Sequence, residues 1–186
     1  SQSADTWLIN AGDTVTIPDG YSWSNPGMNN YIDGRLVVQP RGRLAMGRFY
    51  SSVSNWSIHT EGTVSVSRTA PTYFGTISVA AGLYDQRENT AATIPRYELS
   101  GGKLAIGSSV GQTIISNGVY DMKLTSGSFN GGLTWLGGTI ANWRIASNTE
   151  RGKVKNEQKA GCTLDISDQT WSAASCAMDW NNFSFG

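Results

Sequence analysis

The sequence predicts an all-β fold whose strands stack as the coils of a solenoid. Three observations support this prediction: a short strand motif recurs along the chain, helical patterns are nearly absent, and the connecting segments are rich in Gly, Asn and Ser. The chain has 186 residues, of which 39% are hydrophobic. That length suffices to bury one core and is too short for two, so we expect one main domain.

The recurring motif is a glycine followed by alternating apolar residues, Gly-x-apolar-x-apolar, which is typical of a turn that leads into a half-buried strand. It is found at Gly34–Val38, Gly42–Met46, Gly62–Val66, Gly75–Val79, Gly102–Ile106 and Gly131–Trp135, with near-matches after Gly12 and Gly161. The intervals vary from about 8 to about 30 residues, which does not indicate a strict-period repeat. The long segments Arg48–Glu61 and Gly82–Glu98 fall between motifs, so we interpret them as loops extruded from the coils.

Helix-favouring residues gather only in Glu150–Ala160, which contains Gly152 and a single apolar side chain, Val154. Because it has no amphipathic stripe, we interpret this segment as a solvated connector or a short terminal turn. Short strands separated by Gly, Asn and Ser are compatible with a sandwich, a closed barrel or a solenoid. Recurrence of one short strand pattern favours the solenoid, with a β-sandwich as the alternative.

Two of these runs carry a resemblance to a known class of proteins. Ile32–Val38 and Leu99–Ile106 resemble the coils of right-handed parallel β-helices in autotransporter-type adhesin passengers and in phage tailspike or tail-fibre tips. The resemblance spans residues 7–147, and the loose spacing and short length depart from those families. It implies a right-handed parallel β-helix in an extracellular protein, displayed on a cell or virion surface as part of a longer appendage.

The chain is accordingly divided into a β-solenoid domain at residues 1–147, and a charged connector with a C-terminal cap segment at residues 148–186. Cys162 and Cys176 have no histidine beside them, so a disulfide is favoured over a metal site or two buried thiols. A bridge that closes a loop of about 15 residues contributes about 3 kcal/mol and implies an oxidising compartment. Aromatic residues of this tail would cover the open end of the solenoid: Trp171, Trp180, Phe183 and Phe185.

Charge excludes several classes of partner. Only 15% of the residues are charged and the net charge is +0, whereas nucleic-acid binding requires a clustered excess of Lys and Arg. The local basic group is either a solvated strand face or a patch for an anionic ligand, and consists of Arg35, Arg41, Arg43 and Arg48. No apolar run is long enough for membrane insertion. The N-terminus lacks a signal-peptide pattern, so we expect a mature protein or an excised fragment.

The sequence contains few candidate catalytic residues. The single histidine, His59, has no nucleophile pattern nearby and is predicted to be a polar strand-end residue. Acids from adjacent coils could form a glycosidase pair, but most of them fit turn chemistry; they are Asp33, Asp85, Glu98, Asp121, Asp165 and Asp168. Asp-rich metal loops and phosphate-binding glycine loops are missing from the sequence. We therefore predict no catalytic residue, no metal and no cofactor.

Aromatic residues are the remaining candidates for binding, with 7 Trp and 7 Tyr in the chain. Trp135 follows Leu133 at an alternating position and is expected in the core. Aromatic residues in turn-rich surroundings are expected to be exposed and to bind a ligand, and these are Tyr21, Trp23, Tyr84 and Trp180. Their flat faces suit sugar rings and protein hot spots alike.

These observations favour a non-enzymatic attachment domain of a surface appendage, such as an adhesin, a pilus tip or a phage tail fibre. Its partner would be a cell-surface glycan or a protein receptor, and a homotrimer is compatible with such a role. The alternatives are a fragment of a polysaccharide-degrading glycosidase or lyase, and a purely structural stalk or trimerisation element.

Overall fold

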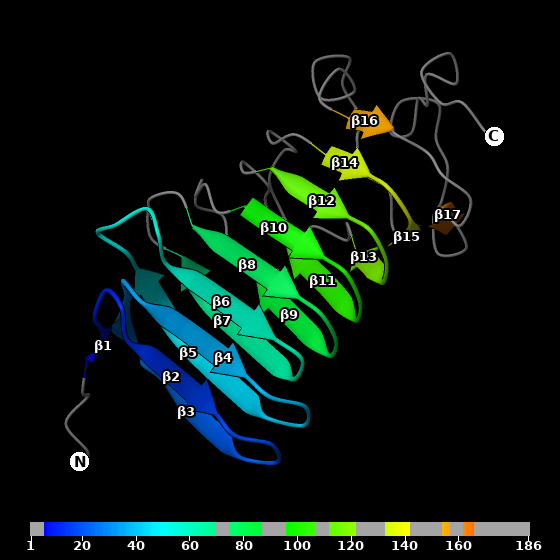
Figure 1. The fold of residues 1–186 in the computed structure, drawn as a ribbon. Coiled ribbons are helices and arrows are strands. Elements are labelled where there is room, and N and C mark those ends of the chain that lie inside the picture. Colours follow the sequence, from blue (N-terminus) through cyan, green and yellow to red (C-terminus); the bar gives the residue numbers. More distant parts are fainter. Residues whose placement is uncertain are drawn as a thin grey trace.

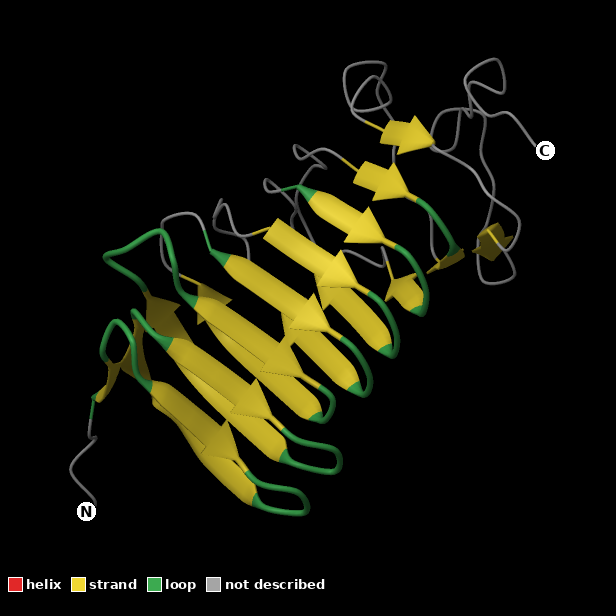
Figure 2. Cartoon of the chain, viewed as in Figure 1, coloured by secondary structure: helices red, strands yellow, loops and turns green. Residues whose placement is uncertain are grey.

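A computed structural model describes residues 6–69, 75–86, 96–106, 112–121, 133–141, 154–156 and 162–165. Within these ranges every regular element is a β-strand, which confirms the predicted all-β class (Figure 2). Since these ranges hold no helix, they also hold no helix long and apolar enough to cross a membrane.

The strands form two parallel sheets between which the chain alternates (Figure 1). Sheet A has nine strands, and they are β1 (Trp7–Ile9), β3 (Ser22–Ile32), β5 (Arg43–Tyr50), β7 (Thr63–Thr69), β9 (Leu83–Gln86), β11 (Lys103–Ile106), β13 (Val119–Asp121), β15 (Gly138–Ala141) and β17 (Cys162–Asp165). Sheet B has eight strands, and they are β2 (Thr14–Ile17), β4 (Arg35–Val38), β6 (Ser57–Thr60), β8 (Thr76–Val79), β10 (Arg96–Leu99), β12 (Thr113–Ile115), β14 (Leu133–Trp135) and β16 (Val154–Asn156).

Consecutive strands lie in opposite sheets, and each strand pairs in parallel with the strand one coil away. This arrangement is a parallel β-solenoid, which confirms the predicted architecture. The antiparallel pairing of a typical β-sandwich is not seen among the described strands. Both sheets continue through β16 and β17, beyond residue 147, where the sequence had suggested that the solenoid ends.

The core lies between the two sheets, and its side chains come from alternate positions of every strand. In β6, for example, Ile58 and Thr60 are buried, whereas Ser57 and His59 are partly exposed. Because the register is preserved, apolar residues stack directly on their counterparts in the next coil, as Leu36 does on Ile58. Trp135 lies in this core, as predicted.

A column of glycines lines the short turns that lead from sheet B into sheet A, and its members are Gly42, Gly62, Gly82, Gly102, Gly118 and Gly138. Each of the first five accepts a hydrogen bond through its carbonyl oxygen from the next coil, as in the 2.8 Å bond donated by the N–H of Lys103 to Gly82. A Cβ atom on Gly102 would lie 2.6 Å from the same oxygen, so the coils stack too closely for a side chain there. These glycines recur about every 20 residues, as in solenoid repeats.

Three of the six sequence motifs lead into strands of sheet B instead: Gly34 and Gly75 precede β4 and β8, and the motif Gly131–Trp135 ends in β14. The motif therefore occurs at two corners of the coil, which explains its irregular intervals. The glycines before β9 and β13 are not followed by the aliphatic alternation of the motif, because the inward positions hold Tyr84, Gln86 and Tyr120.

The prediction of long loops at Arg48–Glu61 and Gly82–Glu98 was wrong in part. The first segment contains the end of β5 and all of β6, and the second contains β9 and the start of β10. Cys162 begins β17, whereas Cys176 and the tail aromatics lie outside the described residues, as do the predicted disulfide and cap.

Candidate functional site

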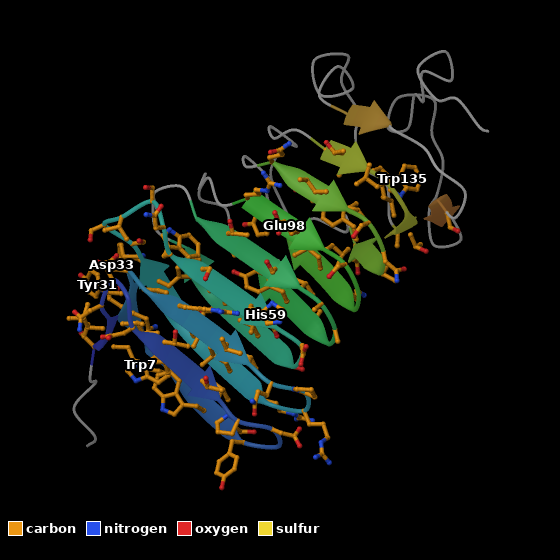
Figure 3. All side chains as sticks on the ribbon, in the orientation of Figure 1. Trp7, Tyr31, Asp33, His59, Glu98 and Trp135 are labelled. Carbon is orange, nitrogen blue, oxygen red and sulfur yellow. The ribbon has the colours of Figure 1, made fainter. Side chains whose placement is uncertain are left out.

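Two of the predicted binding residues lie near the N-terminal end of the solenoid. Tyr21, in the turn before β3, is 68% exposed. Trp23 is only partly exposed, because its ring stacks on that of Trp7 with 3.3 Å between centroids and both rings pack against the core. Trp7 is labelled in Figure 3 beside the first coils. The Trp7–Trp23 pair therefore covers the apolar end of the core, a structural role.

Tyr84 does not lie in a loop, and the expectation that it is exposed was wrong. It points inward from β9 and is fully buried, with its hydroxyl donating a 2.8 Å hydrogen bond to Oε1 of Gln86. Tyr97 of β10 donates to the same oxygen at 3.4 Å. Desolvation by burial raises the pKa of both tyrosines. Trp180, the fourth predicted residue, lies outside the described residues.

A row of one leucine and two tyrosines, called here the aromatic row, crosses β1, the second half of β3 and the end of β5, and the sequence did not reveal it. The ladder between β3 and β5 is interrupted by a register shift between Asn25 and Asn29, and the second half of β3 pairs with β1. Leu8, Tyr31 and Tyr50 are in register across these three strands. Leu8 is 61% and Tyr31 39% exposed, and the two tyrosine rings stack with centroids 5.4 Å apart.

A polar row lies beside the aromatic one on the same strands. Asn29 of β3 is in register with Arg48 of β5, and both are exposed. Nη1 of Arg48 donates a hydrogen bond of 3.5 Å to the Tyr50 hydroxyl, which links the two rows. We call the surface made by Leu8, Asn29, Tyr31, Arg48 and Tyr50 the aromatic–arginine face.

Buried side chains at the alternate positions of β3 and β5 fix the backbone of the aromatic–arginine face. Asn30, fully buried between Asn29 and Tyr31, donates a 2.9 Å hydrogen bond from Nδ2 to the backbone carbonyl of Arg48. Phe49, between Arg48 and Tyr50, packs edge-on against buried Trp56 at 5.4 Å between centroids. The exposed side chains thus project from a backbone whose alternate residues are fixed in the core.

Asp33 connects the turn after β3 to the residues that follow β5, and Figure 3 shows its label next to that of Tyr31 at the edge of the molecule. Its carboxylate accepts hydrogen bonds from Ser51 Oγ (2.9 Å), Ser52 N (2.8 Å) and Ser52 Oγ (2.6 Å). Burial opposes the ionised form, but these hydrogen bonds outweigh desolvation and lower the pKa of Asp33. The residues that follow Tyr50 are therefore tied to the preceding coil.

The candidate acids form a regular pattern on the outside of sheet A. Asp85 and Asp121 hold the same register position two coils apart, with Ala105 between them. Their Cα atoms are about 10 Å apart, from the spacing of two strands. Asp121 is buried, with its side chain 6% exposed, and pairs with Nζ of Lys103 at 2.8 Å. This ion pair gives Asp121 a structural role.

Glu98 and His59 each lie near a charged side chain. Glu98 pairs with Arg96 at 2.7 Å, and Nε2 of His59 lies 3.9 Å from Glu61. Asp165 occupies the register position of Ala141 in β15, and Asp168 lies outside the described residues. Among the residues whose placement is described, no group of three or more His, Cys, Asp or Glu side chains could hold a metal ion.

Comparison with protein-family models, with curated proteins and with solved structures finds no match for this chain.

The aromatic–arginine face could have been found only by aligning the coils. Tyr31 and Tyr50 are separated by nearly the same interval as successive glycines of the turn column, so a repeat of about 20 residues would have placed them side by side. The sequence motif required a glycine and two apolar residues, and neither tyrosine satisfies it.

Proposed function

We propose that this chain is a non-enzymatic attachment domain of an extracellular appendage and that it binds a cell-surface glycan through the aromatic–arginine face. The observation that carries the proposal is the row of exposed Leu8, exposed Tyr31 and half-buried Tyr50 beside Arg48. Aromatic side chains with polar neighbours on a rigid scaffold suit the apolar face and hydroxyl rim of a sugar. The right-handed coil and the adhesin or tail-fibre class implied by the sequence resemblance belong to the same proposal.

The position of the face supports attachment in preference to a purely structural role. Leu8, Tyr21 and Tyr31 are the large hydrophobic residues most exposed in the described part of the chain, and all three belong to the first coils. A lateral stalk interface would place an apolar strip along many coils instead. The outward positions of β6 and β8 carry Ser57, His59, Thr76 and Ser78, which are polar.

A glycan array probed with the purified chain tests the proposal, together with Tyr31→Ala and Tyr50→Ala variants. Loss of one aromatic contact is expected to weaken binding to a selected glycan by about tenfold, which corresponds to about 1.4 kcal/mol. Tyr21→Ala is the matched control, because Tyr21 is exposed but does not belong to the face. Circular dichroism should be unchanged in all three variants.

Two results would overturn this function. One is that the wild-type chain binds no glycan on the array. The other is that binding occurs and survives both substitutions in the aromatic row while Tyr21→Ala abolishes it.

A further inference from the structure

We infer, resting on the proposed function, that the glycan is acidic and that Arg48 binds its carboxylate or sulfate group. The first observation is the distribution of charge along the chain. Residues 29–69 contain five arginines and two acidic residues, a net charge of +3, although the whole chain has a net charge of +0. The coils that carry the aromatic–arginine face are therefore the basic part of a neutral protein.

The second observation is which of the basic side chains already have an acidic partner. Arg41 pairs with Asp19, with 3.0 Å between Nε and Oδ1, and Arg96 pairs with Glu98. Within the part of the chain that the structure describes, the ion pairs involve no other arginine, so Arg48 has no carboxylate partner there. The nearby Asp33 accepts its hydrogen bonds from Ser51 and Ser52 instead.

The third observation is the surroundings of Arg48 itself. Within the described part of the chain its guanidinium donates one hydrogen bond, of 3.5 Å from Nη1 to the Tyr50 hydroxyl, which leaves other N–H groups available.

These features together define one class of ligand. A planar guanidinium binds carboxylate and sulfate oxygens through paired N–H groups, and the tyrosine row beside it offers apolar contact to a ring. An acidic saccharide presents both an anionic group and a sugar ring within a few ångströms. A neutral glycan would contact the tyrosines of the face but would leave Arg48 without an ionic partner.

The test compares matched ligands that differ only in the anionic group. Binding of sialyllactose and lactose tests a carboxylate, and binding of a heparin tetrasaccharide and its desulfated form tests a sulfate. We expect the chain to bind at least one acidic ligand about tenfold more tightly than its neutral counterpart, a preference that weakens as salt is added. Arg48→Gln should abolish the preference, and Arg48→Lys should restore part of it.

Arg41→Gln is the control, because it removes the same charge from the same coils but from a side chain already paired with Asp19. Equal binding of acidic and neutral ligands would overturn the inference while the proposed function stands. A preference that survives Arg48→Gln, or that Arg41→Gln removes equally, would also overturn it, because binding would then follow net charge alone. Absence of binding to any saccharide on these probes and on the array would contradict the proposed function itself.

Discussion

Glycines are the residues on which the coil geometry depends most directly. In the turn column the backbone of one coil lies against the backbone of the next, and several of these glycines adopt the left-handed conformation, with φ of 64° at Gly102. A residue with a side chain at Gly102 would be destabilising for two reasons: the backbone strain of a positive φ and the overlap of its Cβ atom with the preceding coil. The turn column therefore limits the sequence more strictly than the outward strand positions do.

We predict that Gly102→Ala lowers the free energy of unfolding by about 3 kcal/mol. A Cβ atom at Gly102 would lie 2.5 Å from the carbonyl carbon of Ala81, in addition to the strained φ. Gly12→Ala separates the two effects, because Gly12 has a φ of 89° but nothing within 4 Å of its Cβ position. That variant should lose only about 1 kcal/mol in urea denaturation. Equal losses in both variants would show that coil contact does not matter.

Pairs of strands from opposite sheets enclose a polar group within the core. Gln86 of β9 accepts hydrogen bonds from Tyr84 on the same strand and from Tyr97 on β10, so it links sheet A to sheet B. The two tyrosine rings meet edge-on, with centroids 6.3 Å apart. Because a buried hydroxyl without a partner is costly, this cluster favours one position of sheet A relative to sheet B at this coil.

Stability should decrease as the pH rises above 10, the ordinary pKa of tyrosine. Desolvation raises the pKa of Tyr84 and Tyr97 in the folded chain, so the folded state binds these protons more tightly than the unfolded state. Their contribution is therefore complete below pH 10 and is lost at higher pH. Urea midpoints measured from about pH 8 to about pH 11.5 should fall less steeply for Tyr97→Phe than for wild type.

Tyr21→Phe provides the comparison for this pH series, because its side chain is exposed to water in the folded chain. That variant should keep the wild-type slope. If Tyr97→Phe keeps it as well, the buried tyrosine is not responsible for the loss of stability in alkali.

On the scale of the whole molecule, the described strands form one continuous stack that begins with β1 and β2 at the edges of the two sheets. Trp7 and Trp23 cover the core at this end, and the aromatic–arginine face lies on the adjacent coils. The two tryptophans, which cover the core, are therefore close to Tyr31 and Tyr50 of the face. The tryptophans occupy strand positions that point toward the core, and the tyrosines occupy positions that point outward.

The predicted bridge between Cys162 and Cys176 is a property of the whole chain, since it would tie the segment after β17 to the last described coil of sheet A. Alkylation of the unfolded, unreduced protein followed by mass measurement should find no free thiol. Reduction should then lower the free energy of unfolding by about 3 kcal/mol. Two alkylated cysteines without reductant would contradict both the bridge and the oxidising compartment proposed for the protein.

The sequence by itself determined the all-β class, the alternation that fills the core and the glycine turns, because these depend on local backbone geometry and on the period of two along a strand. It also placed Trp135 in the core and Tyr21 at the surface. The stacking of coils into a solenoid was predicted as well, since the same short strand pattern recurs.

Only the tertiary structure decided which residues from different coils share a register. Tyr31, Tyr50 and Arg48 came together because strands one coil apart pair in parallel, a relation between positions about 20 residues apart. The sequence also predicted Tyr84 to be exposed, and this was wrong. Gln86, a polar residue at the next inward position, interrupts the apolar alternation, and only the packing between the sheets shows that both side chains are buried. Long-range pairing thus decided the candidate site, because local patterns do not specify which coil positions become neighbours.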